Sequence, residues 1–211
     1  MPASTHQTEN CFIDGPSGQL EAMISRPSGE ATACGIICHP HPQHAGTMHN
    51  KVVTTLNWAM EAMGWVTVRF NYRGVGKSAG EYDNQIGEVE DARAVYQWLQ
   101  AHYPHLPIHL AGFSFGAYIS AKLASQLPAA SLVSAAPVVS YSTYSDLAPI
   151  SCPWFAIVGE ADELVSVDEI ENYRQESGQQ FELHSFPETS HFFHGQLIPL
   201  REAVKAFYTN Y

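Results

Sequence analysis

A serine flanked by glycines lies near the middle of the chain, in the sequence Gly112-Phe113-Ser114-Phe115-Gly116. It fits the pattern G-x-S-x-G, which places a nucleophilic serine on a tight turn between a strand and a helix. Side chains two residues before and after the serine would collide with the neighbouring strand and helix, so glycine is needed at both places. The turn lifts the hydroxyl out of the sheet, beside the free N–H groups that begin the helix. Ser114 is therefore the candidate nucleophile.

A serine hydroxyl needs a base to take its proton, and the base needs a carboxylate to orient it. After a turn of this kind, the order along the chain is serine, then Asp or Glu, then histidine. Asp162 follows the apolar run 153–159, in the sequence GEADELVS, where a loop can reach a histidine. Glu160 and Glu163 are its alternatives. We predict Asp162 as the acid, because Glu160 lies closer to the strand and Glu163 lies one residue beyond the favoured position.

A histidine follows the last strand-like segment, 180–186, in the sequence PETSHFFHG. His191 has the position and the chain order that the base requires, and we predict it in that role. His194 is the alternative, but it abuts the start of the final helical segment. Phe192 and Phe193 are predicted to wall the site and to exclude water from it.

The elements that must position these residues alternate along the chain. Apolar and β-branched runs predict strands at 34–38, 65–72, 107–113, 131–139, 153–160 and 180–186. Helical spacing of apolar residues predicts helices at 50–64, 86–102, 115–127, 166–177 and 195–208. The first 30 residues are predicted as an antiparallel hairpin with DGPSG as its turn. This alternation predicts an α/β fold with a mostly parallel sheet covered by helices on both faces, in one domain over residues 1–211.

The composition limits the partners of the chain. Of its 211 residues, 45% are hydrophobic and 15% are charged, which is typical of a globular protein. A net charge of −11 excludes nucleic acid and anionic membrane as favoured partners. The N-terminus lacks the basic and apolar regions of a signal peptide, and no C-x-x-C pair is present. We therefore expect reduced cysteines and a cytoplasmic protein.

Several segments of the chain, from about residue 35 onward, resemble the α/β-hydrolase superfamily: HPHPQHAGTMHNKVV, RFNYRGVGKSAGEYD, GFSFGA, GEADELV and SHFFHG. The first two are similar, more narrowly, to small lidless bacterial hydrolases related to dienelactone hydrolase. The resemblance implies the α/β-hydrolase fold, a triad of Ser114, Asp162 and His191, a small-molecule substrate and no cofactor. Dienelactone hydrolases use a cysteine nucleophile, so lactone chemistry does not carry over to a chain with Ser114.

Four histidines crowd the segment CHPHPQHAGTMHNK. In the resembled fold, the loop after the strand at 34–38 donates one of two backbone N–H groups that stabilise an oxyanion. Pro40 and Pro42 have no N–H. Just beyond the strand, the donor is therefore predicted to be His41, and the resemblance implies the same position. The second donor is predicted to be the N–H of Phe115, directly after the nucleophile.

Two motifs suggest other ligands but fit them poorly. Zinc needs three or four converging ligands, whereas the H-P-H-P run directs its two imidazoles to opposite sides of an extended segment. The segment GVGKS at 74–78 matches the end of a phosphate-binding G-x-x-x-x-G-K-[ST] loop, but Asn71 stands where its first glycine is required. We expect no metal and no phosphate. In the resembled family, the 74–78 loop borders the active site.

Only SYSTYSDLAPIS separates the strand at 131–139 from the next, which is too short for an inserted helical lid. An open site suits small or short-chain esters, so we predict a serine hydrolase that cleaves such an ester through an acyl-enzyme. A peptidase, a thioesterase or an acyltransferase could use the same triad. The alternative outside the enzymes is a module that binds a ligand without catalysing a reaction.

Overall fold

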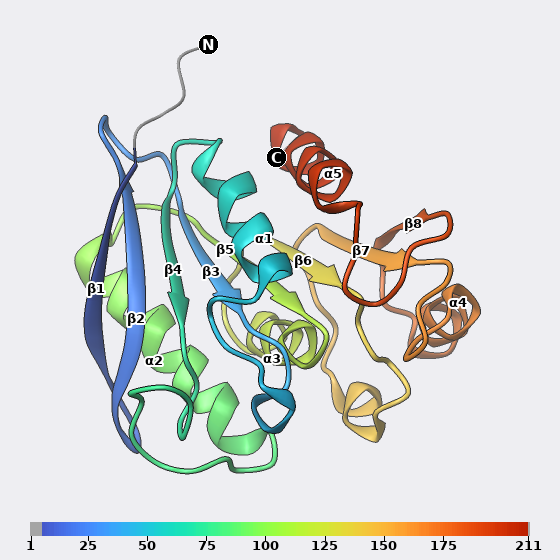
Figure 1. Cartoon of the computed structure of the whole chain (residues 1–211), viewed down its shortest axis with the longest axis horizontal. Coiled ribbons are helices and arrows are strands. Elements are labelled where there is room, and N and C mark those ends of the chain that lie inside the picture. Colours follow the sequence, from blue (N-terminus) through green and yellow to red (C-terminus); the bar gives the residue numbers. More distant parts are fainter. Residues whose placement is uncertain (1–5, 211) are drawn as a thin grey trace.

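The computed structural model describes residues 6–210, except for the side chain of Ser142. Eight strands of these residues form one sheet in the order β1-β2-β4-β3-β5-β6-β7-β8, which is seen in Figure 1. They are β1 (His6–Gly15), β2 (Gly18–Pro27), β3 (Cys34–Cys38), β4 (Val66–Phe70), β5 (Ile108–Phe113), β6 (Ser131–Ala135), β7 (Trp154–Gly159) and β8 (Glu182–Phe186). The single sheet of the predicted α/β fold is confirmed.

The sheet is mostly parallel, as predicted. The six strands β4-β3-β5-β6-β7-β8 pair parallel with one another, whereas β2 pairs antiparallel with both β1 and β4. β1 and β2 form the predicted hairpin, in which Gly15 pairs with Gly18 across the turn. The first five residues of the predicted hairpin lie outside the described residues.

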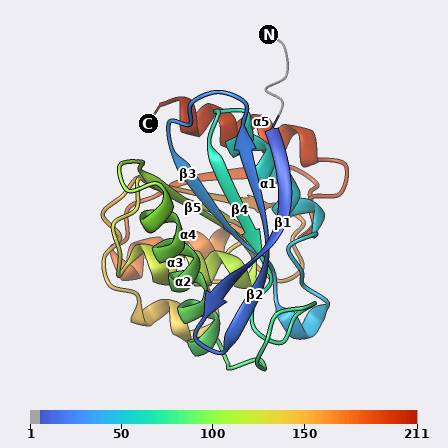
Figure 2. The same cartoon turned by 90° about the vertical axis from the view of Figure 1, so that its left-hand side faces the viewer.

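Helices cover both faces of the sheet. They are α1 (Lys51–Glu61), α2 (Ile86–His102), α3 (Phe115–Ala124), α4 (Val167–Ser177) and α5 (Leu197–Thr209). Figure 2 shows α1 and α5 on one face and α2, α3 and α4 on the other. Side chains alternate between the two faces of a strand, so Ile36 of β3 packs among the residues of α2 and α3 while Ile37 packs against α1. Both are fully buried, which explains why the strand is apolar throughout.

The order of the strands fixes where a ligand can bind. From β3 the chain crosses to β4 on one side, and it then returns through α2 to β5 on the other side of β3. In open α/β sheets, ligands bind at the carboxyl ends of strands where the order reverses in this way. Cys38 and Gly112 pair there, so the loop beginning at His39 and the turn at Ser114 emerge side by side.

Most of the strands are shorter than predicted, and the largest difference is in β6. The strand expected at 131–139 ends at Ala135, because Ala136 has a positive φ of 45° and Pro137 has no N–H to donate to a ladder. The chain between β6 and β7 contains only a short 3-10 helix, η2 (Ser142–Asp146), and no lid. No helix among residues 6–210 combines the length and the apolar character needed to cross a membrane.

Candidate active site

Ser114 occupies a strained turn between β5 and α3, with φ 55° and ψ −117°. A Cβ on Gly112 would lie 2.0 Å from the carbonyl oxygen of Gly116, and a Cβ on Gly116 would lie 2.2 Å from that of Cys38. Both contacts are far closer than a methyl group can approach. The steric reason given above for the two glycines is therefore confirmed. The N–H of Ser114 donates to the Ala135 carbonyl of β6 at 2.9 Å, which holds the turn against the sheet.

The structure brings the three predicted side chains together. His191 Nε2 lies 3.0 Å from Ser114 Oγ, and His191 Nδ1 lies 2.8 Å and 3.1 Å from the two carboxylate oxygens of Asp162. The side chain of Asp162 is fully buried and that of His191 is 2% exposed. Because the carboxylate can only accept, Nδ1 carries a proton and donates it, which leaves Nε2 of the neutral ring free to accept from the serine hydroxyl.

Backbone donors fix the carboxylate of Asp162. The N–H groups of Leu164 and Val165 both donate to Asp162 Oδ1, at 2.8 Å and 3.1 Å. Asp162 follows the last residue of β7 by three positions, so the strand end and the two hydrogen bonds together determine where the carboxylate lies. The two hydrogen bonds fix the orientation in which the carboxylate meets the imidazole of His191.

The alternative residues lie elsewhere. Glu160 accepts a hydrogen bond from the Ser185 hydroxyl on β8, and Glu163 accepts one from the backbone N–H of His191 at 3.3 Å. His194 is exposed, with its ring 6.0 Å from that of Phe192. None of these three bonds the imidazole of His191, although Glu163 holds the backbone of the loop that carries it.

Of the two phenylalanines predicted to wall the site, only one does so. Phe192 is 44% exposed and lines the cavity at Ser114. Phe193 is fully buried among the core residues contributed by α1 and α5, so its predicted role is wrong. The cause is a tight turn: Phe193 has a positive φ of 52° and donates its N–H to Ser190, which directs its ring away from Phe192 and into the core.

The two predicted oxyanion donors flank Ser114. Phe115 is the first residue of α3, and His41 lies on the loop after β3. Within residues 6–210, the backbone N–H groups of His41 and Phe115 donate to no protein acceptor. The His41 carbonyl accepts the N–H groups of His44 and Gly46, both at 3.0 Å, so the loop around its N–H is closed into a tight turn.

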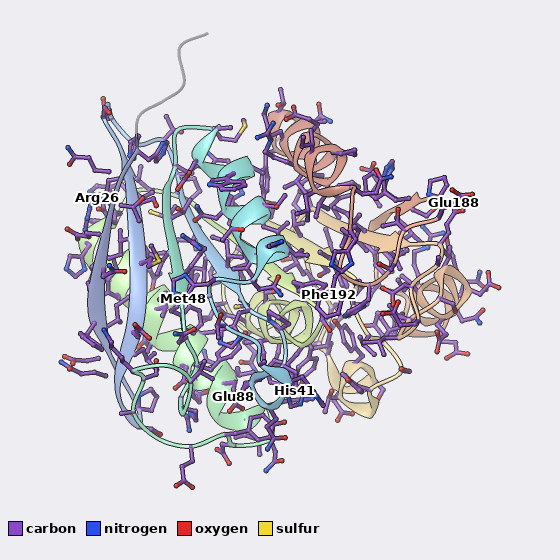
Figure 3. The ribbon with its side chains drawn as sticks, in the orientation of Figure 1. Arg26, His41, Met48, Glu88, Glu188 and Phe192 are labelled. Atoms are coloured by element: carbon purple, nitrogen blue, oxygen red, sulfur yellow. The ribbon has the colours of Figure 1, made fainter. Side chains whose placement is uncertain are left out.

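A cavity of about 370 Å³ opens onto the serine. Its lining comprises Pro40, His41, His44, Ala45, Gly46, Asn50, Ser114, Tyr141, Leu164, His191 and Phe192. Figure 3 shows His41 and Phe192 on the same side of the molecule, although they come from the loops after β3 and β8. The volume lies at the lower end of the range typical of small-molecule sites.

Comparison with known proteins identifies the family. Residues 29–151 match the family model described as Hydrolase_4, serine aminopeptidase, S33. The chain belongs to this family of α/β hydrolases. An α/β serine hydrolase homologue from Coxiella burnetii is 50% identical, with a TM-score of 0.91 over 94% of this chain and 96% of that one. An α/β serine hydrolase without a lid from Xanthomonas campestris is 39% identical, with a TM-score of 0.89 over 98% and 95%.

An uncharacterised protein of Rickettsia prowazekii is 36% identical over 166 residues, which make up 76% of this chain and 70% of that protein. These relatives support the α/β-hydrolase superfamily and the lidless architecture expected from the sequence. The narrower link to dienelactone hydrolases stays a prediction.

The histidines of the loop after β3 serve different purposes in this hydrolase. His39 is fully buried, and because its Nε2 accepts the N–H of Tyr72 at 3.2 Å, its proton sits on Nδ1 and is donated to the Pro40 carbonyl at 2.7 Å. Burial lowers the pKa of His39 to about 3, so the ring is neutral. His39 thus ties the end of β3 to the chain after β4, a role that sequence reasoning missed.

His41 points the other way, as the H-P-H-P pattern predicts. Its ring packs 4.8 Å from that of Phe115, its Nδ1 accepts the N–H of Gln43 at 3.2 Å, and its Nε2 lies 3.4 Å from the Tyr82 hydroxyl. Burial, and the charge of His44 to a smaller extent, lower the pKa of His41. Among the described side chains, no group of three or more His, Cys, Asp or Glu is arranged to hold a metal ion.

The carboxylate of Glu21 holds the loop at 74–78 in place. Glu21 Oε2 accepts the N–H of Lys77 and the side-chain amide of Asn71, both at 2.9 Å, and these bonds lower the pKa of Glu21. A negative charge already occupies the place where a phosphate would have to bind. Residues 74–78 do not line the cavity; Tyr82, further along the same connection, contacts His41 instead.

Proposed function

We propose that this protein is a serine hydrolase that cleaves small or short-chain carboxylic esters through an acyl-enzyme, with Ser114, His191 and Asp162 as its triad. The observation that carries the proposal is the chain of two hydrogen-bond contacts, 3.0 Å from Ser114 Oγ to His191 Nε2 and 2.8 Å from His191 Nδ1 to Asp162, at the wall of a cavity. This is the arrangement by which a serine hydroxyl becomes a nucleophile.

The proposed reaction has two halves. His191 Nε2 takes the hydroxyl proton while Ser114 Oγ attacks the ester carbonyl carbon, and the same nitrogen then gives that proton to the departing alcohol as the ester C–O bond breaks. In the second half, water gives a proton to His191 and attacks the acyl carbonyl carbon. The bond between that carbon and Ser114 Oγ then breaks, His191 returns the proton to Oγ, and the acid is released. Asp162 holds the ring and stabilises the imidazolium in both halves.

The oxyanion of each tetrahedral intermediate would lie between the N–H groups of His41 and Phe115. Both groups lack a protein acceptor within residues 6–210, so they are available to the substrate. The N–H of Phe115 also begins α3, where the positive end of the helix dipole adds to the attraction. One such donor typically contributes about 3 kcal/mol to lowering the barrier.

The charge of the cavity favours an ester over the substrate of an aminopeptidase. An aminopeptidase must bind the ammonium group of its substrate, for which a carboxylate is the ordinary partner. The residues that line the cavity include no aspartate or glutamate among the described side chains. A neutral ester needs no carboxylate in the cavity. A lidless site of this size suits an ester with small substituents.

The test is labelling with a fluorophosphonate probe together with hydrolysis of p-nitrophenyl esters from acetate to decanoate. The wild-type protein should be labelled and should hydrolyse the shorter esters fastest. Ser114→Ala should lose both labelling and hydrolysis while its circular dichroism spectrum stays unchanged. Absence of hydrolysis by the wild-type protein, or hydrolysis that persists in Ser114→Ala, would refute the proposal.

A further inference from the structure

Apolar side chains gather at the mouth of the cavity. Tyr141, Leu164 and Phe192 are 41%, 52% and 44% exposed, and all three line the cavity. They come from three different loops, those after β6, β7 and β8. These side chains are not part of the hydrophobic core, because none belongs to the two clusters of core residues. A surface of this kind indicates contact with an apolar part of a ligand.

Two of these residues, Phe192 and Leu164, lie close in sequence to His191 and Asp162 of the proposed triad. Phe192 follows His191 directly, and its ring stands perpendicular to the imidazole with the centroids 5.3 Å apart. The Phe192 ring is also 5.7 Å from that of Phe113, which steadies it. Leu164 donates its N–H to Oδ1 of Asp162, whose two carboxylate oxygens both lie within hydrogen-bond distance of His191 Nδ1. The positions of both apolar side chains relative to His191 are therefore fixed by short local connections.

The proposed chemistry determines which part of a substrate meets them. The carbonyl oxygen must lie between the N–H groups of His41 and Phe115, on the loops after β3 and β5. The atom that leaves must come within hydrogen-bond reach of His191 Nε2, because that nitrogen supplies its proton. The leaving group therefore extends along the side of the cavity formed by the loops of His191 and Asp162, where Phe192 and Leu164 lie.

We infer that the hydrolase selects esters whose leaving group is a neutral, apolar alcohol, and that Phe192 and Leu164 determine this specificity. The inference rests on the proposed function. Aspartate and glutamate are both absent from the described residues that line the cavity, so a cationic leaving group would find no opposite charge there. As the C–O bond breaks, the alcohol departs with the proton from His191, and its alkyl or aryl part stays in contact with the two side chains until release.

The experiment measures kcat/KM for ethyl, n-propyl, n-butyl and n-hexyl acetate. These alcohols have nearly equal acidity, so the series reports contact with the leaving group and not the ease of its departure. With the wild-type protein, kcat/KM should rise with each methylene, by at most about fourfold, the full effect of burying one CH₂. Phe192→Ala and Leu164→Ala should each flatten this rise.

Two exposed residues outside the cavity provide matched controls. Trp58→Ala removes an aromatic side chain from α1 and Ile198→Ala an aliphatic one from α5; both residues are exposed and neither lines the cavity. Both variants should keep the wild-type slope. A second series, the ethyl esters of acetate, butyrate and hexanoate, should keep its own slope in Phe192→Ala and Leu164→Ala, because only the acyl part varies.

The outcomes separate this inference from the function on which it rests. Ser114-dependent hydrolysis with a flat alcohol series, or a slope unchanged by both cavity variants, would overturn the inference and leave the hydrolase standing. Loss of slope in the acyl series alone would assign the two residues to the acyl group, and the inference would again be wrong. If no ester is hydrolysed and Ser114 is not labelled, the proposed function fails and the inference fails with it.

Discussion

The carbonyl oxygen of Cys38 lies 2.2 Å from the point that a Cβ on residue 116 would occupy, so the end of β3 packs directly on the backbone of Gly116. The contact joins the loop that carries His41 to the helix that begins at Phe115. Any side chain at position 116 would have to push these two elements apart, and with them the two N–H groups proposed to bind the oxyanion.

Gly116→Ala should therefore lower both stability and activity. Overpacking of this kind typically costs about 1 to 3 kcal/mol of the free energy of unfolding, which urea denaturation measures. Ester hydrolysis should fall more steeply than the folded fraction does, because the donors move apart. Gly29→Ala is the matched control, since a Cβ there meets nothing within 4 Å. Wild-type stability and turnover in Gly116→Ala would contradict the packing that is described.

Replacing His191 and His194 in turn tests which of these two histidines is the base. His191→Ala should reduce kcat/KM for a p-nitrophenyl ester nearly as far as Ser114→Ala, since members of a triad act as a unit. His194→Ala should keep most of the wild-type value, because His194 is exposed and does not line the cavity. The opposite result, with His194→Ala inactive and His191→Ala active, would show that the base is misassigned.

The acid should be less costly to replace than the base. Asp162→Asn keeps an oxygen to accept the N–H groups of Leu164 and Val165, so the loop should hold its shape. The amide would favour the wrong tautomer of His191, and kcat should drop by about 10⁴-fold. Steady-state kinetics at neutral pH measures the loss. Activity within a few fold of wild type would remove Asp162 from the triad and leave the nucleophile in place.

Stability should fall in mild acid because two histidines are buried in neutral form. Burial lowers the pKa of His39 to about 3 and that of His109 to about 4, whereas in the unfolded chain each would have an ordinary value of about 6.5. Between these values the unfolded chain binds more protons than the folded one, so the free energy of unfolding rises with pH. The stabilisation is complete above about pH 6.5 and is lost as the pH falls toward 4.

Urea denaturation at pH 7.5, 6, 5 and 4 measures this effect. Each buried histidine contributes a slope of up to about 1.4 kcal/mol per pH unit in that window. His109→Gln, which removes the ring that contacts the Ser131 hydroxyl at 2.8 Å, should lower stability at pH 7.5 and also remove one of the two slopes. The exposed His102 offers the control His102→Gln, which should keep the wild-type pH dependence.

Much of the fold and of the candidate site could be predicted because the signals are local. The G-x-S-x-G pattern is contained within five residues, and the strands and helices follow from short apolar patterns. Asp162 and His191 could be selected because each follows a strand of a parallel sheet, and the carboxyl ends of such strands meet at one edge. The structure places His191 against Ser114, 77 residues away in sequence, and Asp162 against the other ring nitrogen of His191.

What sequence reasoning missed depends on contacts between distant segments or on the direction of one turn. Nothing near His39 indicates that its ring accepts the N–H of Tyr72, 33 residues later. Nothing near GVGKS indicates that Glu21, 56 residues before Lys77, supplies the charge that holds it. Phe192 and Phe193 have the same character in sequence, and only the positive φ of Phe193 decides which ring reaches the cavity and which reaches the core.

Locating the modified residue shows directly whether Ser114 forms a covalent acyl-enzyme. The wild-type protein is treated with a fluorophosphonate, or quenched in acid during turnover of p-nitrophenyl acetate, and its peptides are mapped by mass spectrometry. A mechanism through an acyl-enzyme on Ser114 requires one added group per chain, on Ser114, in both experiments, and none in Ser114→Ala or in protein unfolded beforehand. A modification on any other residue, or turnover of the ester without a detectable adduct on Ser114 in either experiment, would contradict it.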